Sequence, residues 1–322
     1  MTDDRERLAE ARALHAADRL DAAGRLYGEI LRESPDQAAA LHGLALVMLD
    51  AGELEEALEL AVAAARWAPA EAIYHNSLGL VREARGESAE ALAAFEQAVA
   101  LDPGFAGAWV NLGEARMAAG DHAGAAIAFG RAATIAPDAP TDAARGDAYR
   151  LLGRLDLARA AYQASLERDK AFADARFGLA LVEFGEGRLE AAETALRSLV
   201  ADQPRFAPAW AVLGNALAAR GRLWDAVDAF RRALEVEPDH AGTNANLGAA
   251  LMALGRPEEA RDSCLTALRC RPEHAEAHLW LALALLQLGK RAEAREHAAR
   301  AVALRPELEE DPAMTPLRDL MF

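Results

Sequence analysis

The chain has 322 residues, a formal net charge of −16 and only 6% aromatic residues. This acidity excludes the positive surface that phosphate binding requires, so no nucleic-acid partner is expected. Two cysteines are too few for a disulfide scaffold and favour a reducing compartment, which predicts a cytoplasmic protein. The charged N-terminus does not resemble a signal peptide, and the longest apolar run, 279–286, is too short for a membrane span, so no membrane insertion is expected.

Two residue types recur along the chain with the same spacing. Prolines stand at 35, 69, 103 and 137, and again at 204, 238, 272 and 306, with 34 residues between neighbours in each series. Glycines at 52, 86, 120, 153, 187, 221, 255 and 289 keep this spacing, except for one step of 33 residues between Gly120 and Gly153. The shared period predicts nine units, with Asp18 at the glycine's place in the first unit.

Each unit is predicted to consist of a helix, a glycine turn, a second helix and a proline turn. Glycine can adopt the left-handed conformation that ends a helix, and proline prevents a helix from continuing. Small residues are expected to let the two helices approach closely. They are Gly79, Gly113, Gly214 and Gly248 in first helices, and Ala91, Ala125, Ala226 and Ala260 in second helices. Because one hairpin cannot bury its apolar face alone, neighbouring units must stack, which predicts an all-α solenoid.

The predicted elements form four parts in chain order. These are repeats 1 to 4 in residues 1–138, an atypical repeat in 139–172, repeats 6 to 9 in 173–308, and a C-terminal tail in 309–322. We interpret the tail as a cap over the last repeat, with a free docking motif as the alternative.

The atypical repeat departs from the others in its first helix. It lacks the large apolar residue and the glycine expected there, and offers Asp142, Arg145 and Gly146. Two readings stay open for this segment. It is either a weak joint or a drifted but rigid repeat.

The repeated unit resembles the tetratricopeptide repeat. The pattern is Trp109-x-x-Leu112-Gly113, then Ala125-x-x-x-Phe129 and Pro137; Trp210, Leu213, Gly214, Ala226, Phe230 and Pro238 repeat it. The resemblance covers about residues 4–308. It implies a right-handed superhelix whose first helices line a concave groove that holds peptides or partner helices. The predicted function is therefore a protein-interaction scaffold or adaptor with a protein or peptide partner.

The candidate partner-binding residues lie on the groove side of the first helices. Phe177 and Phe184 are predicted aromatic anchors, while part of the apolar stripe around them is expected to be core between repeats. An asparagine amide can both donate to and accept from a peptide backbone. Four asparagines lie on this side: Asn76, Asn111, Asn215 and Asn246. The resemblance implies such a role, because asparagines on the groove helices of O-GlcNAc transferases, which contain this repeat, bind a peptide backbone. In this chain other residue types interrupt the series of groove asparagines.

No cofactor, metal site or catalytic site is predicted. Cys264, Cys270, His274 and His278 have the residue types of a zinc site, but Pro272 separates the cysteines from the histidines and Cys264 falls at a core place. The chain contains no nucleophile elbow, phosphate loop or dinucleotide fingerprint. Since the repeats occupy nearly every residue, the chain is not expected to be an enzyme.

Two alternatives to the adaptor remain open. The chain could be a regulatory or substrate-presenting subunit of an enzyme encoded by another chain, such as a glycosyltransferase. It could also self-associate, with the groove or the terminal repeat holding another copy. Binding of chaperone C-termini is not expected, because the only lysines are Lys170 and Lys290. The preference for alanine, and for arginine over lysine, indicates a GC-rich bacterial genome.

Overall fold

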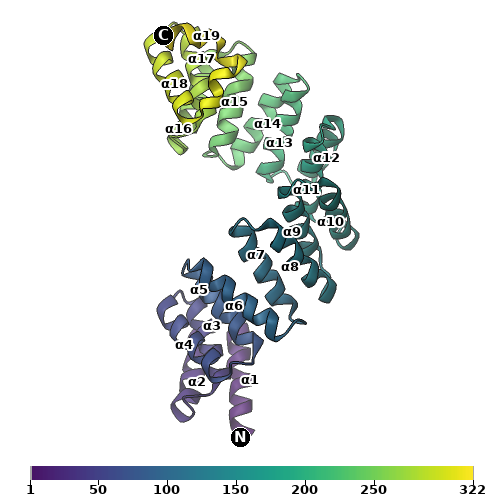
Figure 1. Ribbon diagram of the computed structural model, residues 1–322, viewed down its shortest axis with the longest axis vertical. Coiled ribbons are helices and arrows are strands. Elements are labelled where there is room, and N and C mark those ends of the chain that lie inside the picture. Colours follow the sequence, from purple (N-terminus) through teal and green to yellow (C-terminus); the bar gives the residue numbers. More distant parts are fainter. Residues whose placement is uncertain (1, 322) are drawn as a thin grey trace. The chain divides into compact units, whose positions relative to one another are not determined.

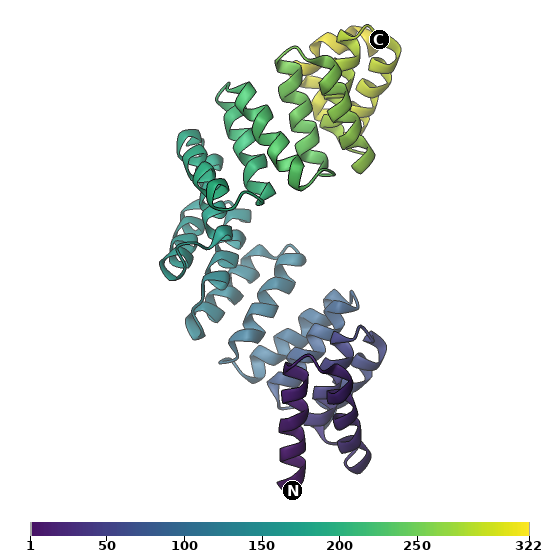
Figure 2. The ribbon, with the colours of Figure 1, turned by 180° about the vertical axis from the view of Figure 1, so that it is seen from behind.

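The computed structural model describes residues 2–321, in which consecutive helices form antiparallel hairpins (Figures 1 and 2). Backbone contacts divide the chain into two compact units, residues 1–175 and 176–322, and each unit is described by itself. No strand is present between residues 2 and 321, and the predicted all-α hairpin solenoid is confirmed. None of the helices in this range has the length and apolar character needed to cross a bilayer.

The first unit holds five hairpins. Their helices are α1 (Thr2–Ala16), α2 (Leu20–Glu33), α3 (Ala38–Asp50), α4 (Leu54–Trp67), α5 (Ala72–Ala84), α6 (Ser88–Leu101), α7 (Ala106–Ala118), α8 (His122–Ile135), α9 (Ala139–Leu151) and α10 (Leu155–Arg168). We call the odd-numbered helices first helices and the even-numbered ones second helices. Neighbouring first helices such as α3 and α5, or α5 and α7, also contact each other, so they share one face of the unit.

The second unit holds four hairpins and a short C-terminal segment. Its elements are α11 (Ala173–Gly185, which begins at the end of the first unit), α12 (Leu189–Asp202), α13 (Ala207–Ala219), α14 (Leu223–Val236), α15 (Ala241–Ala253), α16 (Pro257–Cys270), α17 (Ala275–Gln287), α18 (Arg291–Leu304), the 3-10 helices η1 (Pro306–Glu310) and η2 (Pro312–Met314), and α19 (Thr315–Met321). The finer division into 1–138, 139–172, 173–308 and 309–322 stays a prediction.

The predicted turn glycines adopt the left-handed backbone conformation. Their φ angles lie between 70° at Gly255 and 80° at Gly52, and Asp18 takes the same role with a φ of 58°. The residue after the turn closes the helix end, as where the N–H of Glu53 donates to the carbonyl of Met48 at 2.9 Å. The sequence prediction of these turns, including the first one at Asp18, is confirmed.

Helical glycines set how closely the two helices of a hairpin approach. The ring of Phe129 lies on Gly113, where an added Cβ would stand 2.6 Å from the ring, and Phe95 and Phe230 pack in the same way on Gly79 and Gly214. At Gly248 the sulfur of Cys264 takes the place of the ring. The predicted close approach is thus a contact between a bare backbone and a large buried side chain.

The hairpin of α9 and α10 corrects one expectation. The expected glycine is present, because Gly146 stands 33 residues after Gly113, which matches the single shortened step of the repeat. Tyr162 packs on it as Phe129 packs on Gly113, with its ring 2.6 Å from an added Cβ. What this hairpin lacks is the large apolar residues at the places that Trp109 and Leu112 take in α7.

A charged cluster occupies the place of those apolar residues. Asp142 is only 2% exposed, and its two carboxylate oxygens contact Nη2 of Arg145 at 2.9 Å and Nε of Arg168 at 2.8 Å. Arg168 ends α10, so the cluster joins the first helix of this hairpin to the second. A buried carboxylate is tolerated because two guanidinium groups satisfy it.

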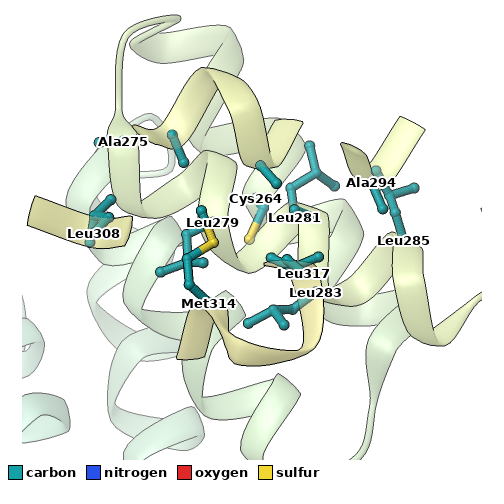
Figure 3. Packing of buried hydrophobic residues seen from close by; sticks show 13 residues of the cluster. Cys264, Ala275, Leu279, Leu281, Leu283, Leu285, Ala294, Leu308, Met314 and Leu317 are labelled. Carbon is teal, nitrogen blue, oxygen red and sulfur yellow. The ribbon is translucent and has the colours of Figure 1, made fainter. Parts of the chain in front are cut away.

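The C-terminal segment covers the last hairpin (Figure 3). Leu308, Met314 and Leu317 are buried in one cluster with Leu279 and Leu283 of α17. This packing removes apolar surface of the terminal hairpin from water, as terminal repeats require.

Candidate partner-binding site

In the first unit, two of the predicted asparagines form a pair on neighbouring first helices. Nδ2 of Asn111 on α7 donates to Oδ1 of Asn76 on α5 at 2.8 Å. Asn76 is 7% exposed and Asn111 is half-buried. The bond leaves Nδ2 of Asn76 and Oδ1 of Asn111 without another partner among the residues described, so one donor and one acceptor group remain for a ligand.

The second unit repeats this arrangement with the other two asparagines. Nδ2 of Asn246 on α15 donates to Oδ1 of Asn215 on α13 at 2.9 Å. Both residues line a pocket of about 250 Å³ between the two first helices, whose walls include Val212 and Thr243. Asn246 is exposed and Asn215 is half-buried, so the amide groups are accessible from this pocket.

The pairing was not predicted, although the residues were. The two pairs are separated by 35 and 31 residues, neither of which is the 34-residue period of the repeat. Two residues one repeat apart project in parallel from neighbouring first helices. When the spacing differs from one repeat, the two side chains project in different directions and can point toward each other. Aligning the repeats shows that Asn111 and Asn246 occupy the same place in their repeats, but it does not reveal that Asn111 bonds to Asn76 or Asn246 to Asn215.

The two predicted aromatic anchors lie on α11 and are half-buried. The ring of Phe177 packs edge to face against Phe206, with the ring centroids 5.3 Å apart and an interplanar angle of 66°. Part of the Phe177 ring is thus covered within the second unit. Neither Phe177 nor Phe184 lines the pocket of the Asn215 and Asn246 pair.

Sequence reasoning missed a buried carboxylate in the second unit. Glu193 on α12 is 3% exposed and contacts Arg197, Arg220 and Arg222. Its Oε1 lies 2.7 Å from Nη1 of Arg222. These contacts fix α12 to the turn between α13 and α14. The available signal was that Glu193 precedes the buried Leu196 by three residues and so lies on the same helix face.

The cysteines and histidines whose types suit zinc are not gathered into one site in the part of the chain that the structure describes. Among the described residues, no group of three or more His, Cys, Asp or Glu side chains is placed to hold a metal ion. Cys264 is buried, and this burial raises the pKa of its thiol to about 12, whereas Cys270 is exposed at the end of α16. Cys264 therefore stays protonated near neutral pH and acts as a packing residue.

Comparison with solved structures supports the fold. The APC/C hetero-tetramer Cut9-Hcn1 matches 98% of this chain with a TM-score of 0.52 and 20% identity, and this chain spans only 55% of the matched chain. PilF of Pseudomonas aeruginosa matches 66% of this chain and 96% of its own, with a TM-score of 0.59 and 16% identity. At these identities the likeness concerns the fold alone. No curated protein sequence matches this chain.

Family models identify the repeat itself. One tetratricopeptide repeat model matches residues 76–140, 212–273 and 245–309, and a second matches residues 14–80 and 149–216. The matches fall on the hairpins described above and include α10, but residues 141–148 of α9 lie outside them. The chain therefore belongs to the tetratricopeptide repeat family.

Proposed function

We propose that this chain is a non-enzymatic scaffold or adaptor that binds peptide or helical segments of partner proteins on the face formed by its first helices. Membership of the tetratricopeptide repeat family supports a protein-interaction role in general. The observation that supports the first-helix face is the recurrence of an asparagine pair, once in each unit, with the same direction of hydrogen bonding.

An asparagine pair suits a peptide backbone better than a particular side chain. The free Oδ1 of Asn111 or Asn246 can accept a peptide N–H, and the free Nδ2 of Asn76 or Asn215 can donate to a peptide carbonyl. Because each pair is already joined, its amides are held in place before a ligand arrives, which reduces the entropy lost on binding. Such contacts are tolerant of the partner's sequence.

The aromatic residues of α11 would add specificity to this grip. Phe177 and Phe184 are half-buried, and each can offer the exposed part of its ring as an anchor for an apolar side chain. As part of the proposal, the protein acts in the cytoplasm of a bacterium, which accords with its two unpaired cysteines. Its net charge of −16 argues against a nucleic-acid partner.

The test is affinity capture from native lysate with the wild-type chain and with the Asn111→Ala/Asn246→Ala variant. A matched control is Gln97→Ala/Gln163→Ala, which removes two exposed amides from second helices. We expect the asparagine variant to lose a partner that the wild type and the control retain. Circular dichroism of all three proteins checks that the helices are intact.

Retention of the same partners by all three proteins would place binding outside the asparagine pairs and contradict the proposal. A captured catalytic chain in stoichiometric amount would identify the protein as an enzyme subunit. Light scattering of the purified chain over a range of concentrations tests self-association, and a rising mass that the asparagine variant abolishes would mean that the first-helix face binds another copy.

A further inference from the structure

The first unit contains a pocket with several polar lining residues that the asparagine pair does not use. Its volume is about 600 Å³, which is within the range of ligand sites. Side chains from α1, α2, α3 and α5 line it, so it opens on the first-helix side of the unit. The polar lining residues are Arg12, His15, Tyr27, His42, Asp50 and Tyr74.

His42 has a buried nitrogen without a hydrogen-bond partner. Its Nδ1 is enclosed and unpaired, and the ring packs against Tyr74 with the centroids 5.1 Å apart. Buried polar atoms nearly always have a partner, so an unpaired one marks a place where a ligand or ion can complete the contacts. Burial, with the charges of Arg12 and His15 adding to it, lowers the pKa of His42 to about 4.

The pocket lining contains one arginine and one acid, and the acid contacts a histidine rather than the arginine. Nε2 of His15 is 2.7 Å from Oδ2 of Asp50, so this carboxylate is already engaged. Arg12 pairs with no acid among the side chains described, yet its charge acts on Tyr27, His42 and Tyr74. Arg12 is exposed, and its guanidinium can therefore pair with the carboxylate of a ligand.

A close packing contact forms the floor of the pocket. Tyr27 lies across Gly43, where an added Cβ would stand 2.6 Å from the tyrosine hydroxyl oxygen. Only glycine leaves room for this ring between α2 and α3. The phenol hydroxyl is thereby held beside the pocket, where it adds a hydrogen-bond donor to those of Arg12 and the histidines.

The pocket and the asparagine pair share helix α5, which supplies Ile73 and Tyr74 to the pocket and Asn76 to the pair. Ile73 precedes Asn76 by three residues, so their side chains lie on the same face of α5, about 4.5 Å apart along the helix axis. A peptide at Asn76 and Asn111 would thus bring a neighbouring side chain to the pocket.

We propose that this pocket binds the carboxylate of an acidic side chain, Asp or Glu, on the peptide whose backbone the Asn76 and Asn111 pair contacts. The inference rests on the proposed function and adds a charge requirement to it. Arg12 supplies the counter-charge, while His42 and the tyrosine hydroxyls supply uncharged donors. Two acids lie near these groups: Asp50 holds His15, and the charge of Glu71 acts on Tyr74.

The experiment is an NMR titration of the full chain with histidine and tyrosine side chains labelled. The probe is N-acetyl-glutamate N-methylamide, which carries one acidic side chain between two peptide groups, and its uncharged match is the glutamine analogue. We expect the glutamate probe to shift the resonances of His42 and Tyr74 and to raise the pKa of His42, because a bound anion favours the imidazolium. Arg12→Gln should weaken probe binding by about tenfold, whereas Arg32→Gln, at an exposed place on α2, should not.

The outcomes separate this inference from the proposed function. If the glutamate and glutamine probes bind equally and both shift the Asn111 side chain, observed in a second sample labelled at asparagine, backbone binding stands and the acidic pocket is wrong. If acetate binds as tightly as the glutamate probe, the site holds a free anion and the link to a peptide is wrong. If neither probe shifts any resonance of His42 or Tyr74, the pocket is not a carboxylate site.

Discussion

Two neighbouring hairpins of the first unit reach the same packing with different chemistry. In the pair of α7 and α8, Trp109 and Leu112 form the apolar side of the first helix, and Leu112 is 1% exposed. In the pair of α9 and α10, the same places hold Asp142 and Arg145, and Asp142 is 2% exposed. Both hairpins nevertheless place a ring on a glycine at the same place of the first helix.

The difference separates two requirements of the repeat. The contact between a glycine and an aromatic ring sets the closeness of the two helices and recurs in both hairpins. The rest of the buried volume must be filled, and any polar group in it must have a partner. An apolar pair fills the volume through dispersion contacts, whereas an ion cluster does so with charges that neutralise each other. The ion cluster differs in one respect, since it depends on each of its members.

The largest effect is expected from removal of the central carboxylate. Asp142→Ala leaves Arg145 and Arg168 without their acid and should lower the local free energy of unfolding by about 3 kcal/mol. This is the low end of the range for broken buried pairs, because the side chains of Arg145 and Arg168 are 26% and 42% exposed. Hydrogen exchange of peptides from α9 and α10, resolved by mass spectrometry, measures this loss.

A double substitution tests whether charge itself is needed. Asp142→Leu/Arg145→Leu restores the apolar character found at Trp109 and Leu112, and should recover most of the stability lost in Asp142→Ala. If the double variant is as unstable as the single one, the ion cluster fixes the hairpin geometry in a way that apolar packing cannot replace.

The glycine contact should respond equally in both hairpins. Gly113→Ala and Gly146→Ala each place a Cβ 2.6 Å from the ring of Phe129 or Tyr162. The ring must move, and overpacking of this kind costs about 2 kcal/mol. Hydrogen exchange of α7 and α8 in one variant and of α9 and α10 in the other should show similar losses. A clearly smaller loss for Gly146→Ala would mean that the atypical hairpin is already loosely packed, as a weak joint would be.

The two rings differ by one hydroxyl group. Tyr162 donates its hydroxyl hydrogen bond to Oδ1 of Asp147 at 2.7 Å, whereas Phe129 has no such bond. Tyr162→Phe should cost about 1 kcal/mol, the usual net contribution of one hydrogen bond. Chemical denaturation of the variant and the wild type, followed by circular dichroism, measures the difference. A variant more stable than the wild type would show that burial of the Tyr162 hydroxyl destabilises the hairpin.

The same hydroxyl gives the atypical hairpin a pH dependence that the other hairpin lacks. Burial, together with the carboxylate of Asp147, raises the pKa of Tyr162 above its ordinary value of about 10. The neutral phenol is favoured in the folded state, so its stabilising effect is fully present below pH 10 and is lost as the pH rises beyond that value. Tyr162→Phe should remove this alkaline loss in α9 and α10. An unchanged alkaline profile would assign the loss to other groups.

Most of the fold could be predicted because the repeat is marked by residues with local conformational roles. Glycine at Gly52 and its equivalents, and Asp18 in the first unit, adopt the left-handed conformation whatever the distant sequence. The error at Gly146 had a different origin. With the single shortened step between Gly120 and Gly153, Gly146 already falls at the place of Gly113, so the glycine was present in the sequence and was overlooked.

The candidate site was less predictable because it depends on side chains from several helices. The asparagines were identified from their places on the first helices, but their pairing requires a displacement between neighbours that a periodic pattern does not express. The pocket of Arg12 and His42 is built from four helices, and it depends on Tyr27 crossing Gly43. No single segment of the sequence contains that arrangement.

The smallest effect is expected at the last residue of the second helix, which is isoleucine in one hairpin and arginine in the other. Ile135 ends α8 at the place that Arg168 has at the end of α10, and Ile135 is 40% exposed. Ile135→Arg should change the unfolding free energy by less than about 0.5 kcal/mol, because α7 has Trp109 where α9 has the carboxylate of Asp142, so the new guanidinium finds no acid there.

The reverse change, Arg168→Ile, should lower the unfolding free energy by about 1 kcal/mol, since Asp142 then keeps only Arg145 as a partner. Hydrogen exchange of the second helices measures both. Equal effects would mean that Arg168 adds nothing to the cluster, so that the atypical hairpin would depend on Arg145 and Asp142 alone.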